Sequence, residues 1–276
     1  MKKLLFILLC LPIIGFGQQT YVPDDVFEDY LELQGLGNGI PNDDSVLTNS
    51  INNFVGGLYL TPSSGLLGTI TDLTGIEDFK SLLALHIEFQ QISELDLTQT
   101  KFHSYGFSVY PQIFITSNHL LEKIILPNDT IGQSLINENS FLKEIISSNS
   151  TYVGSQFSVI NNSSLSSFDM SIIGGILGGA TLTVSQSDSL ELLNLSNGFC
   201  NNWGTVLIGL NPILFCIQVD NPNYSEIVWT WSEILIDPLL YSYSTNCGWT
   251  SSIDEHTTHK ELLKVTDLLG RETKGT

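Results

Sequence analysis

The sequence predicts a mainly β protein, namely a right-handed, leucine-rich-repeat-like solenoid with a short N-terminal helical cap and a disulfide-linked C-terminal cap. The main observation is a returning motif of three apolar residues, separated by two positions and then by one. It reads Leu82–Leu85–Ile87, Ile92–Leu95–Leu97, Phe102–Tyr105–Phe107, Leu121–Ile124–Leu126, Leu165–Phe168–Met170, Leu190–Leu193–Leu195 and Leu214–Ile217–Val219. Such a return indicates one structural unit stacked on copies of itself.

The spacing of the third motif position gives the length of the unit. From Leu126 it advances to Ser147, Met170, Leu195 and Val219, in steps of 21, 23, 25 and 24 residues. These steps fall within the ~20–29 residues of leucine-rich repeats. Further apolar pairs lie between the motifs, at Ile113/Ile115, Phe157/Val159 and Leu182/Val184. We therefore expect a second short strand in each turn of a solenoid that spans residues 69–222.

Alternation within these strands predicts which side chains face solvent. It turns Leu, Ile and Phe inward, and it turns Glu88, Asp96 and Asp169 outward. Four asparagines each follow a third motif position by two places: Asn128, Asn149, Asn197 and Asn221. Asn can bond the backbone of a corner with its side chain, so we expect these four to stabilise corners and to form a ladder.

Residues 18–68 are expected to form the N-terminal cap. Asp25 and Glu28 have the spacing of a capping box, and apolar residues follow at helical spacing: Val26, Phe27, Tyr30 and Leu31. Gly35, Gly37 and Gly39 then end the predicted helix. Asp43 and Asp44 are expected to lie in a solvated turn, with calcium binding as the alternative.

The first 17 residues resemble a secretory signal peptide. Three residues, Met1-Lys2-Lys3, precede an apolar run that ends at Ile14, and Gly15-Phe16-Gly17 places small residues before a cleavage site at Gln18. The run is too short for a membrane span of about 20 residues. Lipidation at Cys10 is the alternative. We therefore expect a secreted protein, extracellular or attached to the cell surface, without a transmembrane segment.

The charge of the chain is strongly acidic. The formal net charge is −19, and residues 18–249 contain 4 basic and 24 acidic side chains. A phosphate backbone would be repelled, so nucleic acid is excluded as a partner.

The cysteines and aromatic residues near the C-terminal end indicate a second cap, over residues 223–249. We expect Cys216 to pair with Cys247 and Cys200 to stay free, because export permits disulfides; three buried thiols are the alternative. Six aromatic residues are expected to cover the last coil, with a sugar-stacking platform as the alternative: Tyr224, Trp229, Trp231, Tyr241, Tyr243 and Trp249.

Three segments resemble leucine-rich-repeat proteins secreted by Bacteroidetes bacteria: residues 21–28 (YVPDDVFE), 70–77 (ITDLTGIE) and 211–220 (NPILFCIQVD). Residues 260–272 (KELLKVTDLLGRE) are similar to the start of the C-terminal sorting domain of proteins that the type IX secretion system exports. The resemblance implies that Cys216 pairs with a downstream cysteine, here Cys247. It also implies that residues 250–276 are a partial C-terminal sorting domain, read by the type IX secretion machinery. The family implies protein or glycan interaction and no catalytic residues.

The motifs of enzymes are weak in this chain. His86, His103 and His119 are 17 and 16 residues apart, which does not match the repeat, and no HExxH arrangement is present. Adjacent carboxylates such as Glu77 and Asp78 point to opposite faces of a strand. We expect a non-catalytic protein, without cofactor or metal, that binds a protein or glycan at the cell surface. A carbohydrate-active β-solenoid enzyme and a structural adhesin component are the alternatives.

Overall fold

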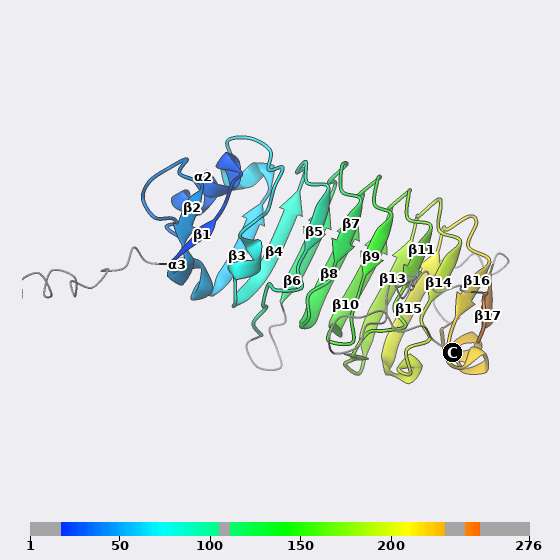
Figure 1. Ribbon diagram of the computed structural model, residues 1–276. Coiled ribbons are helices and arrows are strands. Elements are labelled where there is room, and N and C mark those ends of the chain that lie inside the picture. Colours follow the sequence, from blue (N-terminus) through cyan, green and yellow to red (C-terminus); the bar gives the residue numbers. More distant parts are fainter. Residues whose placement is uncertain (1–17, 105–110, 230–240, 249–276) are drawn as a thin grey trace, which may run out of the picture.

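The structure is a computed structural model that describes residues 18–104, 111–229 and 241–248. Within these ranges the chain forms a parallel β-solenoid of about 7 turns (Figure 1). Several predicted features lie outside the described residues. They are the signal peptide, the motif positions Tyr105 and Phe107, Trp231 and Trp249 of the C-terminal cap, and the partial sorting domain. The predicted fold class is confirmed.

One broad side of the solenoid is an eight-stranded parallel sheet of longer strands, in the order β15-β13-β10-β8-β6-β4-β3, with β12 beside β10. Its strands are β3 (Gly56–Leu60), β4 (Leu82–Glu88), β6 (Gln112–Thr116), β8 (Thr130–Asn137), β10 (Tyr152–Ile160), β12 (Gly175–Ile176), β13 (Ala180–Ser185) and β15 (Trp203–Gly209). The sheet thus begins at Gly56, inside the segment that was expected to cap it.

The other broad side is made of three-residue strands in two sheets, β5-β7-β9 and β11-β14-β16-β17. The strands are β5 (Glu94–Asp96), β7 (Lys123–Ile125), β9 (Glu144–Ile146), β11 (Ser167–Asp169), β14 (Leu192–Asn194), β16 (Cys216–Gln218) and β17 (Ser242–Ser244). The apolar motif occupies this side in most coils. Its first copy, around Leu85, lies instead in β4, so the 10-residue step from Ile87 to Leu97 leads from one side to the other.

In-register stacking gives each coil the interior that it lacks by itself. Ile124 pairs with Leu95 on one side and Ile145 on the other, and Leu193 pairs likewise with Phe168 and Ile217. All of these side chains are buried in one continuous hydrophobic core. Glu88, Asp96 and Asp169 lie on the outer surface, as predicted, and none of them is buried.

The N-terminal cap contains β1 (Gln19–Tyr21), α2 (Asp25–Leu33), β2 (Ser45–Leu47) and α3 (Thr48–Asn52). The predicted helix is confirmed, but the predicted capping box is wrong. Asp24 is the N-cap, and its Oδ1 accepts from the backbone N–H groups of Val26 and Phe27 at 3.1 and 3.0 Å. Its Oδ2 accepts from the backbone N–H of Thr71 at 2.8 Å. One carboxylate therefore starts the helix and ties it to the loop at residue 71.

Tyr30 protects the open edge of the long-strand sheet. Its buried hydroxyl accepts a hydrogen bond from the backbone N–H of Tyr59 in β3, at 3.0 Å. A free edge strand presents unpaired N–H groups to other chains, and this contact occupies one of them. Helix α2 thus performs the capping role that was predicted for it.

A buried side-chain ladder joins the corners that follow the longer strands. The Oδ1 of Asn118 accepts a hydrogen bond from the backbone N–H of Gln90 at 2.8 Å. In the same way, the Oδ1 of Asn139 accepts from the backbone N–H of Asn118 at 3.0 Å, and the Oδ1 of Asn162 accepts from that of Asn139 at 3.1 Å. Ser187 and Asn211 continue the series. The residue before each ladder position has a positive φ of 55–56° or 58°: Phe89, Ser117, Glu138, Asn161, Gln186 and Leu210.

The ladder does not contain the four asparagines that were predicted to form one. Asn128 and Asn197 bond backbone carbonyls at the opposite corner, those of Thr98 and Met170, and Asn221 is the N-cap of α4. Asn149 is exposed and only accepts from the hydroxyl of Ser150. Three of the four therefore stabilise local backbone as expected, but no hydrogen bond described in the structure links any of these four to another.

The C-terminal cap consists of α4 (Pro222–Val228) and β17, which pairs in parallel with β16 and so adds one further strand to the solenoid. Trp229 is buried, and three tyrosines pack partly buried against the core: Tyr224, Tyr241 and Tyr243. The interpretation of these four aromatics as a cover over the last coil is confirmed. The remaining short 3-10 turns are Pro62–Ser64, Ile76–Asp78 and Cys200–Asn202.

Candidate functional site

The two broad sides of the solenoid differ in charge. In the longer strands the only Asp, Glu, Lys or Arg is Glu88, at the end of β4. The three-residue strands carry Glu94, Asp96, Lys123, Glu144 and Asp169. The ion pairs found in the described part of the chain, Lys123–Glu94 and Lys143–Glu122, also lie on that side. An acidic chain thus keeps one broad surface almost free of charge.

We call the outward side chains of β3, β4, β6, β8 and β10 the long-strand face. Parallel pairing in register arranges them in rows, and one row runs from Tyr59 through His86 and Phe114 to Leu135. Further along this row, the outward Ser158 of β10 and Thr183 of β13 are both buried. The accessible part of the row therefore ends at Leu135 in β8, while the exposed Tyr152 and Gln156 extend the rest of the surface to β10.

Within the row, the aromatic rings take two orientations. His86 and Phe114 stack with ring centroids 4.5 Å apart and an interplanar angle of 23°, which turns their edges outward. Tyr59 meets His86 at 4.9 Å and 77°. The ring of Tyr59 is therefore nearly perpendicular to the stack, and the side chain is 46% exposed.

Glycines allow two tyrosines to lie flat on this surface. A Cβ atom at Gly57 would lie 2.6 Å from Cε2 of Tyr59, so the ring occupies the space above that glycine. Tyr152, 40% exposed, lies in the same way over Gly174 and Gly175, where an added Cβ would come within 2.9 and 3.1 Å of its ring. Both tyrosines thus pack their rings against glycine and stay exposed to solvent.

A second row on the long-strand face carries amides. Gln112 pairs with Gln133, and Gln133 with Gln156, on adjacent strands. The Nε2 of Gln112 donates to the Oε1 of Gln133 at 3.1 Å, and the Nε2 of Gln156 donates to Ser158 at 3.0 Å. A primary amide has two donor hydrogens and an acceptor oxygen with two lone pairs. These bonds orient the amides and leave hydrogen-bonding capacity facing solvent.

His86 is held neutral within its row. Burial between the neighbouring rings lowers the pKa of its imidazole, while a hydrogen bond with Gln112 and the charge of Glu88 act in the opposite direction. Its Nε2 is buried and has no hydrogen-bond partner among the described groups. His86 therefore adds to the uncharged character of the surface.

The three histidines considered in the sequence lie at different points of the coil. His86 is within β4, and His119 lies exposed at the ladder corner, where its Nδ1 is 3.3 Å from the hydroxyl of Ser140. His103 follows the bridge between Leu82 and Phe102, at the start of β4. The structure does not gather them into one site.

An acidic cluster lies in the N-terminal cap, where carboxylate oxygens of Asp25, Glu28 and Asp44 come within 4.8 Å of one another. The buried carboxylate of Glu28 accepts from the backbone N–H groups of Asp43 and Asp44, at 3.2 and 3.0 Å. Burial is the main cause that raises its pKa. Glu28 thus fastens the loop to α2, which is a structural task that the sequence did not indicate.

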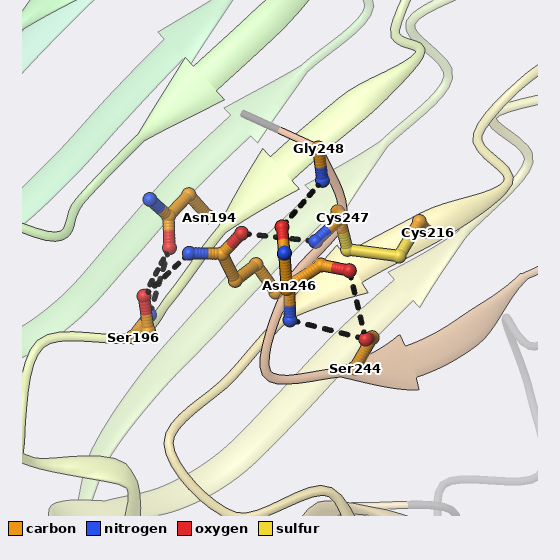
Figure 2. Close-up of a disulfide and its surroundings, with 8 residues drawn as sticks. Asn194, Ser196, Cys216, Ser244, Asn246, Cys247 and Gly248 are labelled. Carbon is orange, nitrogen blue, oxygen red and sulfur yellow. Dashed lines mark hydrogen bonds between the residues drawn. A yellow bond between two sulfur atoms is a disulfide. The ribbon is translucent and has the colours of Figure 1, made fainter. Parts of the chain in front are cut away.

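The disulfide lies at the C-terminal end of the short-strand side (Figure 2). As predicted, Cys216 pairs with Cys247, with their Cα atoms 5.8 Å apart, and Cys200 is a buried free thiol. The backbone N–H of Cys247 donates to the Oε1 of Gln218 at 3.1 Å, and the Nε2 of Gln218 donates to Ser196 at 3.2 Å. The bridge and these bonds fix the last described segment to β16.

The long-strand face was missed in the sequence. Its signal was available, since the strands around Ile113, Phe157 and Leu182 contain Gln, Ser and Thr but no charged residue. Comparison of the chain with family models, with curated proteins and with solved structures found no match. No helix in the described part of the chain is long and apolar enough to cross a bilayer.

Proposed function

We propose that this protein is a non-catalytic, secreted repeat protein that binds a protein or glycan at the cell surface. The observation that supports this role best is the long-strand face, a broad surface that is nearly uncharged in a chain of net charge −19. Charge on a surface keeps acidic proteins apart in solution, so a large area without charge is suited to contact with a ligand.

Export and attachment are part of the same proposal. The signal-peptide pattern of residues 1–17 and the resemblance of residues 250–276 to a sorting domain support secretion by the type IX machinery. Expression in a bacterium that has this machinery tests the proposal. We expect the full chain at the cell surface or in the medium, and a chain that ends at Gly248 in the periplasm. Equal export of both would contradict the sorting role.

The binding role is tested by presenting the mature chain to a glycan array and to purified cell-surface proteins, with a parallel assay for released sugars. Binding without turnover is expected. Release of product would show a carbohydrate-active enzyme instead, and self-association without any soluble ligand would favour a structural adhesin component.

A further inference from the structure

The long-strand face also restricts the chemistry of its ligand. Resting on the proposed function, we infer that this face binds an uncharged polysaccharide. Tyr59 and Tyr152 would pack against sugar rings, and the amides of Gln112, Gln133 and Gln156 would bond sugar hydroxyls.

The charge distribution favours a neutral ligand. Between β3 and β10 the face offers no basic side chain, so it has no group that could pair with a carboxylate, sulfate or phosphate. The 24 acidic residues of the surrounding chain would repel such ligands. Acidic side chains stand only at the margin of this face, where Glu88 ends β4 and the exposed Glu138 follows β8. Binding energy on this face must therefore come from packing and from neutral hydrogen bonds.

The two tyrosines have the geometry that packing on sugars requires. A pyranose ring has an apolar C–H face, which packs on the face of an aromatic ring. The rings of Tyr59 and Tyr152 lie over glycines and are open to solvent, whereas His86 and Phe114 present edges because they stack on each other. An interface with another protein is usually centred on buried apolar anchors, but Phe114 and Leu135 are only partly exposed here.

The separation of the tyrosines points to a polymer rather than a single sugar. Tyr59 is in β3 and Tyr152 in β10, with β4, β6 and β8 between them. A strand spacing of 4.7–4.9 Å places them about 19 Å or more apart. The row of Gln112, Gln133 and Gln156 lies on the strands between and beside them. Such a row repeats a hydrogen-bonding group at each strand, which suits a chain of repeated hydroxyl-bearing units.

The experiment compares the mature wild-type chain with variants by affinity gel electrophoresis and calorimetry. The neutral probes are galactomannan, xyloglucan, mixed-linkage β-glucan and starch, and the acidic probes are alginate and polygalacturonate. We expect binding to at least one neutral probe and to no acidic one. Tyr59→Ala should weaken it about fivefold, since a packed aromatic contact contributes about 1 kcal/mol.

Two further variants and a control separate binding from folding. Gly57→Ala keeps the tyrosine but forces its ring to move, and Gln133→Ala removes one amide; each should weaken binding severalfold. Tyr21→Ala is the control, because Tyr21 is also an exposed tyrosine but lies in the N-terminal cap. It should leave the affinity unchanged, and circular dichroism should show all variants folded.

The outcomes distinguish this inference from the proposed function. Failure to bind any neutral probe overturns the inference, while binding to a purified protein would keep the proposed binding role. Binding that Tyr59→Ala, Gly57→Ala and Gln133→Ala leave unchanged also overturns it, since the ligand then sits elsewhere. Release of sugars from a bound probe would instead refute the non-catalytic role and leave the ligand class intact.

Discussion

Asn118 and Asn139 occupy the same corner of consecutive coils, and the Oδ1 of Asn139 accepts the backbone N–H of Asn118 at 3.0 Å. The Nδ2 of Asn139 donates to the carbonyl of Ile115 at 3.0 Å, and Asn139 is fully buried. One side chain thus satisfies two backbone groups that are buried away from water. The ladder is therefore a major determinant of the coil's stability.

Replacing this side chain should therefore be costly. Asn139→Ala leaves a buried N–H and a buried carbonyl without these partners, and we expect the free energy of unfolding to fall by about 3 kcal/mol. Urea unfolding followed by circular dichroism measures the change. Asn149→Ala is the matched control: Asn149 is exposed, so the loss should stay within about 0.5 kcal/mol. Similar losses in both variants would contradict a special role of the ladder.

The interior contains a polar exception at Ser147, the third motif position of its coil. Its hydroxyl is buried and has no hydrogen-bond partner among the described groups. Because an unpaired buried hydroxyl opposes folding, Ser147→Val should raise the free energy of unfolding by about 1 kcal/mol. The exposed Ser150 serves as control, and Ser150→Val should have almost no effect. A destabilised Ser147→Val chain would mean that the site has no room for the two methyl groups.

The environment of His86 predicts a loss of stability in mild acid. Its folded pKa is below the ordinary value, chiefly through burial, so below a pH of about 6.5 the unfolded chain takes up a proton that the folded chain does not. Stability therefore declines as the pH falls from about 6.5 toward the folded pKa. The groups facing His86 are Tyr59 of β3, Phe114 and Gln112 of β6, and Glu88 of its own strand.

Urea unfolding at pH 8 and at pH 5.5 measures this decline. In His86→Phe the difference between the two pH values should be smaller than in the wild type. His119→Gln, at an exposed corner, should retain the full difference. An unchanged difference in His86→Phe would assign the decline to other groups.

The disulfide should stabilise the C-terminal end. Cys216 and Cys247 are 31 residues apart, and cross-linking a loop of that length is worth about 3.5 kcal/mol in the chain-entropy description. We expect the double variant Cys216→Ala/Cys247→Ala to lose about that much, and Cys200→Ala to keep the bridge. Thiol titration of the unfolded mature chain should find one free thiol before reduction and three after it. Three free thiols before reduction would contradict the pairing.

The repeat could be predicted because the buried positions of successive coils place apolar residues at a regular spacing in the sequence. Every coil needs inward apolar residues at fixed positions, so the spacing of Leu126, Leu195 and Val219 was visible without a structure. The helix of the cap was visible for the same reason. The sequence did not show whether Asp24 or Asp25 is the N-cap of this helix, because Asp suits that position at either residue and only the geometry decides.

The ladder was not predicted because its residues do not follow the strand that was used to align the repeats. From Asn118 onward they precede the first apolar motif position by three residues, as Asn118 precedes Leu121 and Asn211 precedes Leu214, whereas Gln90 precedes Ile92 by two. The side chains of Gln90 and Ser187 take the same role without being asparagine, since they accept from the backbone N–H groups of Ile70 and Asn162. The uncharged surface was missed because nothing in the linear sequence says which strands share a sheet.

In the ladder, the backbone N–H of each corner donates to a side chain 21 to 28 residues later in the chain. Each corner is therefore completed only by the coil that comes after it. In a chain synthesised from its amino end, the backbone N–H of the newest corner therefore has no such acceptor until the following coil has been made.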